Sequence, residues 1–372
     1  MRAEAVIDPG AVERNCRRLA SELSEGTELC AVVKADGYGH GAVPCAAAAL
    51  AGGATWLAVA AASEAAELRA ELGERARLLV LGALTPRELD LALAAGADVA
   101  VWRRGFLELA EARGRELGIR PQVHVKYDTG MGRLGERDPE LVGGLARSAA
   151  ASPDLDLAGI WTHFATADEP DRSFFDLQLE RFRELALPLR DELGGPILHA
   201  ANSAATLREP GSHLGMVRCG VAIYGLDPFG SDPAEQGLEP ALTLRSYVAA
   251  VKRFEPGDSA GYGRTWTASE PTWVGVLPIG YGDGVRRALS NNAEVLIGGR
   301  RHPVVGTISM DNLTVDLGPE PLVEAGESAI LIGADSGERI LCEELARRLG
   351  TINYEITCGI SPRVPRELAG AR

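Results

Sequence analysis

The segment ARLLVLGALTPRELDLALAAGADVAVW, residues 76–102, contains a strand, a helix and a second strand in immediate succession. Its two apolar runs, residues 76–82 and 98–102, are short and rich in Val and Leu, which is typical of buried parallel strands. Between them, Thr85 followed by Pro86 is a helix start, because threonine caps a helix and proline suits its first position. The segment therefore predicts one strand–helix–strand unit.

The same alternation continues on both sides of this segment, from residue 28 to residue 224. Amphipathic stretches rich in Ala, Leu, Glu and Arg separate eight short apolar runs. The eight predicted strands are residues 28–34, 55–60, 76–82, 98–102, 121–127, 157–163, 196–200 and 215–219. Eight strand–helix units at this spacing predict a (β/α)8 barrel. The alternative is an open doubly wound sheet, which usually carries a glycine fingerprint after its first strand.

The pattern changes after about residue 235, where β-type alternation replaces helical periodicity. The predicted strands there are residues 241–254, 272–280, 293–308, 312–318 and 328–335, and only residues 342–350 have a helical pattern. We therefore expect an α/β barrel domain over residues 1–235 and a mostly β domain over residues 236–372. Residues 1–12 contain a further strand candidate, which we expect could pair with the second domain.

Composition excludes several classes of function. The 372 residues include 52 acidic and 38 basic side chains, giving a formal net charge of −14. This charge argues against a nucleic-acid partner and against an anionic membrane surface. No secretory or membrane-spanning pattern is evident, and the six cysteines have no short metal-binding spacing. We therefore expect a cytoplasmic protein with reduced thiols and no metal site.

Lysine is rare in this chain, and its positions are informative. Of 38 basic residues only Lys34, Lys126 and Lys252 are lysines, so most positions that need only positive charge carry arginine. A lysine can lose its proton and act as a nucleophile or base, which arginine cannot. Lys34 and Lys126 lie at strand ends, whereas Lys252 has no supporting motif and is interpreted as a solvated charge.

The active site of a (β/α)8 barrel forms at the C-terminal ends of its strands. The candidate residues at or just after these ends are Lys34, Lys126, Arg133, His163, Asn202, Ser203, Arg218 and Gly220. An apolar strand before Lys34 favours a neutral amine able to bond an aldehyde cofactor; the alternative is a lysine that merely reaches solvent. Ser203 fits either a phosphate site or a helix cap. Arg218 fits either a core ion pair or a fixed donor to a ligand.

Seven motifs in this order resemble the bacterial alanine racemases, enzymes of fold type III that use pyridoxal phosphate. They are AVVKADGYGHG (31–41), KYDTGMGRLG (126–135), RCGVAIYG (218–225), AGYGRTW (260–266), PIGYGDG (278–284), GTISMDN (306–312) and INYEITCGISPRVPR (352–366). Together they span nearly the whole chain. The resemblance implies a homodimer that interconverts L- and D-alanine in the cytoplasm and supplies D-alanine for peptidoglycan.

The resemblance also implies a role for each matching residue. Lys34 would carry the cofactor covalently and act as one base, and Tyr262 of the other subunit would act as the second. The cofactor contacts would come from Tyr38, His163, Asn202, Ser203, Arg218, Gly220, Val221 and Tyr354. The substrate pocket would include Arg133, Tyr281, Met310 and Asp311. Lys126 matches a lysine that is carbamylated in some members, where its negative charge steadies the arginine equivalent to Arg133.

Three other functions stay open at this point. A serine or broad-specificity racemase would differ in the size of the pocket near Tyr281 and Met310, a feature that shifts selectivity only modestly. A non-catalytic carrier of the cofactor would need the barrel but not the β domain with Tyr262. A decarboxylase of the same fold type would place an acid, rather than Arg218, on the pyridine nitrogen.

Overall fold

The computed structural model describes residues 1–320 and 322–370 and divides into two compact units. The barrel unit consists of Val12–Gly37 and Ala42–Ile223. The β unit consists of Met1–Ala11, Tyr38–Gly41 and Tyr224–Arg372. Contacts within one folded chain do not show which part folds alone, so the expected domain boundary after residue 235 stays a prediction.

The barrel unit contains eight parallel strands in a closed barrel, which confirms the predicted (β/α)8 fold. The strands are β2 (Glu28–Val32), β3 (Trp56–Val59), β4 (Arg77–Val80), β5 (Ala97–Val101), β6 (Gln122–Lys126), β7 (Asp156–Trp161), β8 (Ile197–His199) and β9 (Met216–Cys219). Pairing of β2 with β9 closes the barrel, for example Cys30 beside Arg218. Closure places the C-terminal ends of all eight strands around one rim.

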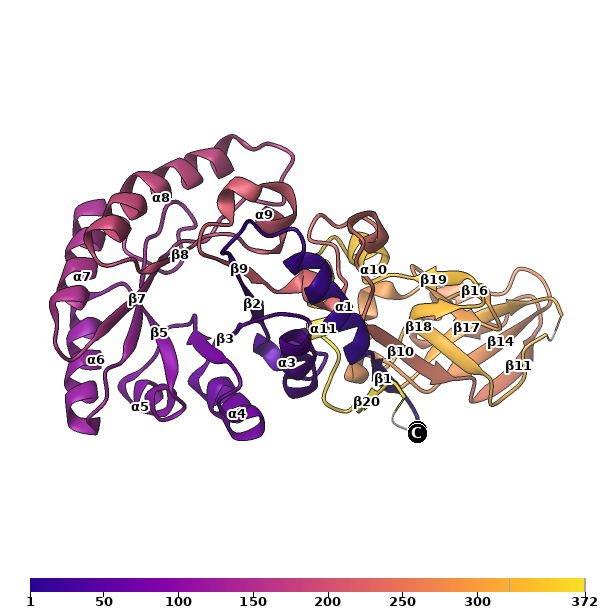
Figure 1. The fold of residues 1–372 in the computed structure, drawn as a ribbon. Helices are drawn as coiled ribbons and strands as arrows, with labels where there is room; N and C mark the ends of the chain where they lie inside the picture. The colour runs from indigo at the N-terminus through magenta and orange to yellow at the C-terminus, as the bar shows by residue number, and fades with distance from the viewer. Residues whose placement is uncertain (321, 371–372) are drawn as a thin grey trace. The chain divides into compact units, whose positions relative to one another are not determined.

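Helices surround these strands (Figure 1). Helix α1 (Pro9–Ala20) precedes the first barrel strand. The helices that follow barrel strands are α2 (Lys34–Tyr38), α3 (Ala42–Ala51), α4 (Ala62–Leu72), α5 (Pro86–Ala94), α6 (Arg104–Leu117), α7 (Pro139–Ala151), α8 (Ser173–Glu192) and α9 (Ser203–Arg208), with 3-10 turns η1 (Pro210–Ser212) and η2 (Val221–Tyr224). The predicted cap of α5 is confirmed. The Thr85 hydroxyl accepts from the Glu88 amide at 3.3 Å, and the Glu88 carboxylate accepts from the Thr85 amide at 2.8 Å.

The β unit is mostly β, as predicted, and contains three sheets among its described residues. The largest has the order β16-β15-β18-β10-β1-β20, with β19 on β18; the others are β11-β14-β17 and β12-β13. The strands are β1 (Glu4–Ile7), β10 (Leu242–Tyr247), β11 (Ala250–Phe254), β12 (Ser259–Ala260), β13 (Trp266–Thr267), β14 (Thr272–Leu277), β15 (Glu294–Ile297), β16 (Arg300–Pro303), β17 (Leu313–Gly318), β18 (Ser328–Asp335), β19 (Glu338–Ile340) and β20 (Arg366–Leu368). Strand β1 is antiparallel to β10 and parallel to β20.

Three expectations for this unit were wrong. The predicted single strand 293–308 contains two antiparallel strands, β15 and β16, which pair with each other. The predicted single strand 241–254 is two strands in different sheets, because the chain turns after β10: the Val248 amide bonds Glu327 and the Ala249 amide bonds Val276. Helix α10 (Cys342–Leu349) matches the predicted helix, but α11 (Asn353–Cys358) was missed. Only six residues long, α11 includes β-branched Ile and Thr, so its sequence gives a weak helical signal. The unit's 3-10 turns are η3 (Pro233–Gln236), η4 (Tyr262–Arg264), η5 (Tyr281–Asp283) and η6 (Arg287–Leu289).

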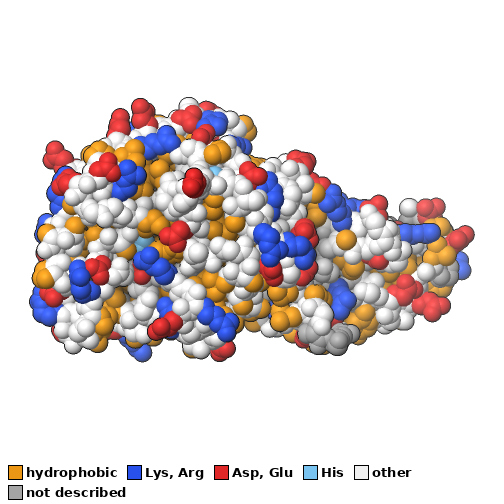
Figure 2. Space-filling model, in the orientation of Figure 1, with side chains coloured by type: hydrophobic (Ala, Val, Ile, Leu, Met, Phe, Trp, Pro, Cys, Tyr) orange, Lys and Arg blue, Asp and Glu red, His pale blue; other side chains and the backbone are white. Residues whose placement is uncertain are grey.

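The surface carries charges of both signs, and most of the cysteines lie in the core. On the face drawn in Figure 2, acidic and basic side chains are interspersed. Five of the six cysteines are buried and Cys358 is exposed. Among the described residues, no helix combines the length and the apolar character needed to cross a bilayer.

Candidate active site

Four of the predicted site residues lie at or beside the C-terminal ends of barrel strands. Lys34 follows β2, Lys126 is the last residue of β6, His163 follows β7 and Arg218 belongs to β9. Their charges act on one another, since Arg218 and Lys34 both lower the pKa of Lys126 and of His163. The structure therefore brings this predicted set together at one rim.

Lys126 is a buried amine in an electropositive setting. Its side chain lies against an aromatic face, with Nζ 4.1 Å from the centre of the Trp161 ring. Burial, followed by the charges of Arg218 and Arg133, lowers the pKa of Lys126 to about 7, and Asp128 only partly opposes this. A substantial fraction of the amine is therefore neutral, and nucleophilic, near pH 7.

Arg218 is buried and firmly held. Its Nη1 donates to Nδ1 of His199 at 2.9 Å, and its Nη2 donates to the carbonyl oxygen of Thr162 at 2.8 Å. The same Nη2 lies 3.2 Å from both Nδ1 of His163 and the carbonyl oxygen of Ala200. Burial lowers the pKa of Arg218 to about 10, so the guanidinium stays charged near pH 7. Its Nε–H has no acceptor among the described residues and is available to a ligand.

His163 is neutral and has a defined proton position. Burial first, and then the charges of Arg218 and Arg133, hold the pKa of His163 well below its usual value. Because arginine can only donate, Nδ1 of His163 accepts from Arg218, and the ring proton is on Nε2. Sequence reasoning placed His163 at this rim.

A cradle of backbone amides lies between α9 and η2. The Ser203 hydroxyl oxygen accepts from the amides of Gly220 at 3.0 Å and Ala222 at 3.4 Å, and Val221 lies between these two residues. The Ser203 hydroxyl can therefore donate its own proton to a further acceptor. The Asn202 side chain caps α9 by accepting from the Ala205 amide at 3.0 Å, so Ser203 is not the cap of this helix. The Ser203 hydroxyl, held in place by these two amides, suits an oxygen of an anion.

The residues after Lys34 form a left-handed turn that sequence reasoning did not foresee. Ala35, Asp36 and Tyr38 have φ of 53°, 52° and 54°, although none is glycine. Such a conformation costs roughly 1–2 kcal/mol per residue, so other contacts must stabilise it. Glu64 does so by accepting from the Ala35 amide at 2.6 Å, and Asp36 accepts from the Ala42 amide at 2.9 Å. No local sequence signal pointed to Glu64.

In the β unit, the structure joins the turn that carries Tyr281 to the segment that carries Met310 and Asp311. The Tyr281 amide donates to the carbonyl oxygen of Ser309 at 3.0 Å, and the Gly282 amide donates to that of Met310 at 2.9 Å. These two bonds fix the predicted pocket residues Tyr281, Met310 and Asp311 next to one another.

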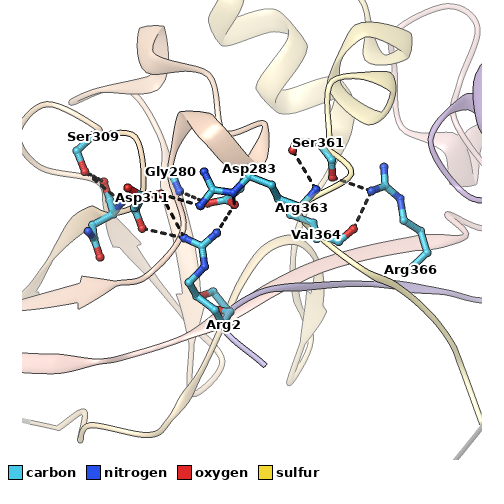
Figure 3. A network of polar contacts seen from close by, with 11 residues as sticks. Arg2, Gly280, Asp283, Ser309, Asp311, Ser361, Arg363, Val364 and Arg366 are labelled. Carbon is cyan, nitrogen blue, oxygen red and sulfur yellow. Dashed lines mark hydrogen bonds and ion pairs between the residues drawn. The ribbon is translucent and has the colours of Figure 1, made fainter.

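A charged network supports this pair of loops (Figure 3). The fully buried Asp283 accepts from the Gly280 amide at 3.0 Å, is hydrogen-bonded by Arg2 and lies 3.5 Å from Nε of Arg363. Arg363 also donates from Nη2 to the Asp311 carboxylate at 2.7 Å. The predicted site did not include Arg2, Asp283 or Arg363, because residues this distant in sequence leave no shared local pattern.

The remaining predicted residues of the β unit differ in exposure. Tyr38 is buried, with ring centres 5.1 Å from Tyr224 and 5.9 Å from Tyr354. Tyr262 is 74% exposed and lines an open cavity of about 380 Å³ together with Thr307 and Ser309. Tyr281 and Met310 are 43% and 51% exposed. Among the described residues, no cluster of three His, Cys, Asp or Glu side chains could hold a metal ion.

Comparison with known proteins covers nearly the whole chain. Residues 7–228 match the alanine racemase N-terminal domain family, and residues 241–368 match the alanine racemase C-terminal domain family. The alanine racemase of Symbiobacterium thermophilum is 44% identical over 367 residues, which is 98% of this chain and 97% of that protein.

Solved structures agree with the sequence comparison. The alanine racemase of Streptomyces coelicolor superposes with a TM-score of 0.94 at 39% identity, over 99% of this chain and 98% of that one. The alanine racemase of Bacillus anthracis, solved with bound L-Ala-P, superposes with a TM-score of 0.89 at 38% identity, over 100% of this chain and 96% of that one. On its sequence, its fold and both family matches, this chain belongs to the alanine racemase family.

Proposed function

We propose that this protein interconverts L-alanine and D-alanine, with pyridoxal phosphate as cofactor, in a homodimer whose active sites are shared between subunits. Membership of the alanine racemase family supports the reaction. The observation that carries the assignment to this chain is the cluster of Lys34, Lys126, Arg133 and Arg218 at the barrel rim, where their charges act on one another.

The residues at this rim fit pyridoxal phosphate. Four basic side chains gather there, at least two of them arginines that stay charged, and the nearby Asp128 carboxylate already accepts from the amides of Gly130 at 3.1 Å and Gly132 at 3.0 Å. Such a cluster favours a ligand with several negative charges. A phosphate ester and a phenolate supply that charge, and the amide cradle beside Ser203 suits the phosphate.

Each part of the rim has a proposed partner on the cofactor. Ser203, Gly220 and Val221, with Asn202, Tyr38 and Tyr354, would hold the phosphate end. Arg218 would donate to the pyridine nitrogen, His163 would lie against the ring, and Lys34 would carry the cofactor covalently. When bound, pyridoxal phosphate supplies an electron sink that stabilises negative charge at the α-carbon of an amino acid.

The protein's own part in racemisation is to move one proton between two faces of the substrate. Lys34 Nζ takes or returns the proton on one face, and the partner subunit's Tyr262 does so on the other with its hydroxyl oxygen. Each base must lie within hydrogen-bond reach of the α-carbon proton. Arg133, together with Tyr281, Met310 and Asp311, would bind the substrate and hold it between them.

Arg218 sets the electrostatics of this site without exchanging a proton. An arginine donates a hydrogen bond but keeps its proton at neutral pH, so a pyridine nitrogen held by Arg218 would stay unprotonated. This limits the charge that the ring withdraws and disfavours transamination. In a decarboxylase with an acid at this position, the acid would instead keep the pyridine nitrogen protonated.

Lys126 is proposed to be carbamylated. Its neutral amine attacks carbon dioxide, a nitrogen–carbon bond forms and one proton leaves to solvent, which converts the neutral amine into an anion. The pKa of about 7 makes the neutral amine available. The new anion would then bond Arg133 and hold it toward the substrate carboxylate.

Racemisation of L-alanine in deuterated water tests the proposal. We expect D-alanine with deuterium at the α-carbon, because each base exchanges its proton with solvent. L-serine in a parallel reaction measures how strictly the pocket selects alanine. No deuterated D-alanine from protein fully loaded with pyridoxal phosphate would refute the proposed function. If it holds, the cytoplasmic role is to supply D-alanine for peptidoglycan.

A further inference from the structure

Behind Arg218, the barrel interior contains a line of three polar side chains that the proposed chemistry does not use. Barrel cores are usually filled with branched aliphatic residues. Here, Nδ1 of His199 accepts from Arg218 at 2.9 Å, Nε2 of His199 lies 2.8 Å from Nδ1 of His124, and Nε2 of His124 lies 3.0 Å from the Asp98 carboxylate. All four side chains are buried, and they come from β9, β8, β6 and β5.

The chemistry of the two ends fixes every proton in this line. Arginine can only donate, so Nδ1 of His199 is an acceptor. Burial, and then the charge of Arg218, holds the pKa of His199 well below its usual value, so the ring is neutral and its single proton is on Nε2. That proton faces Nδ1 of His124, which must therefore be bare. The proton of His124 is then on Nε2 and is donated to Asp98.

Aromatic neighbours also hold both imidazole rings of this line in position. Trp161 stacks on His199 with ring centres 5.6 Å apart and an angle of 4° between planes. Trp56 meets the His124 ring edge-on, with ring centres 5.6 Å apart. At the far end, Asp98 pairs with Arg77 at 3.2 Å. Rotation of either imidazole would break two hydrogen bonds and disturb a packed aromatic ring.

We propose that Asp98, His124 and His199 are positioning residues for Arg218. Their hydrogen bonds all donate in the direction from Arg218 to Asp98, and together they fix the orientation of the Arg218 guanidinium at the rim. The line places a carboxylate at one end and the guanidinium at the other, so neutral imidazoles connect two buried charges. Its consequence for the cofactor rests on the proposed function: the fixed guanidinium directs its Nε–H to the pyridine nitrogen.

The proton positions can be measured directly, with or without cofactor. The chain has only six histidines, so spectra of protein labelled with ¹⁵N-histidine are simple to assign with single His→Gln variants. We expect His124 and His199 each as the neutral form with the proton on Nε2. Either ring found with its proton on Nδ1, or doubly protonated, would overturn the proposal.

An Asp98→Leu variant tests the positioning role. It removes the carboxylate acceptor at the end of this line while keeping the branching of the side chain, so we expect mixed tautomers at His124 and His199. The Arg218 Nε–H resonance, assigned by its loss in Arg218→Lys, should broaden in the cofactor-free protein. We also expect a shifted cofactor absorbance. The kcat should be about tenfold lower and KM for alanine changed less than twofold, because residues that orient a site residue by hydrogen bonding commonly have effects of this size.

His213→Gln is the matched control, because His213 is a fully buried histidine of the same unit that bonds backbone oxygen outside this line. It should change neither the tautomers nor the Arg218 signal. An Asp98→Leu protein that folds with disordered tautomers but an unchanged Arg218 resonance would refute the positioning role. Failure of the proposed function would differ, appearing as wild-type protein with the expected tautomers and no racemisation.

Discussion

The two units surround their site residues in different ways. In the barrel unit, Lys126 and Arg218 are each 3% exposed, and burial lowers the pKa of both. In the β unit, Tyr262 is 74% exposed and Met310 is 51% exposed. These two residues of the barrel unit are thus enclosed, whereas these two residues of the β unit are open.

This contrast indicates what each half requires for catalysis. A buried cation has fixed partners, and its environment has already shifted its proton affinity. An exposed phenol has neither fixed partners nor a low-dielectric setting, so it needs a second surface before it can serve as a positioned base. The open residues of the β unit therefore fit a site that is completed by a partner subunit.

Removal of Lys34 should have the largest effect. Lys34→Ala eliminates both the proposed covalent attachment and one base, so we expect racemisation to fall by at least ~10⁴-fold. The absorbance of the bound cofactor should be lost as well. The matched control is Lys252→Ala, since Lys252 is an exposed lysine in β11 and should be dispensable. Substantial activity in Lys34→Ala would contradict the assignment.

Tyr262→Phe tests the open half of the site. Loss of one hydroxyl removes one base, and we expect a loss of ~10²–10⁴-fold in kcat. Cofactor absorbance should stay unchanged, because the barrel half is intact. Tyr247→Phe, at an exposed tyrosine of the same unit, should retain full activity. Equal activity of the two variants would mean that Tyr262 is not a base.

Asp283→Asn should loosen the substrate pocket without touching the barrel rim. It removes the charge that holds Arg2 and Arg363 beside the turn with Tyr281. We expect KM for alanine to rise about tenfold, equivalent to about 1.4 kcal/mol, with a smaller change in kcat. Glu270→Gln, at an exposed acid of this unit, serves as the control. A lower kcat with unchanged KM would argue against a role in substrate binding.

Lys126 should make stability depend on pH. Its pKa of about 7 in the folded protein lies below the ordinary lysine value near 10.4, so the unfolded chain binds more protons between these pH values. Its contribution to stability is therefore present above about pH 10 and is lost as pH falls toward 7. In denaturant titrations without carbon dioxide, we expect the wild type to gain at least ~1 kcal/mol more than Lys126→Met from pH 7 to pH 9.5. Equal gains would show that Lys126 is not so strongly shifted.

The sequence predicted the elements of the barrel better than the contacts between them. Local apolar runs and caps marked the strands and the start of α5, because these signals depend on neighbouring residues. The rim residues followed from strand ends and from the family resemblance. Contacts such as Asp98 with His124 and Arg2 with Asp283 join residues far apart in sequence, so no local pattern indicates them. The left-handed turn after Lys34 was also missed, since Ala35 and Tyr38 have no preference for it.

Mixing two inactive variants tests the shared active site most directly. Lys34→Ala and Tyr262→Phe subunits, exchanged in equal amounts, form heterodimers in which one of two sites has both bases intact. With random pairing in a twofold dimer, we expect about a quarter of wild-type activity to return. No recovery, despite subunit exchange shown by native mass spectrometry, would contradict the claim that the two bases come from different subunits.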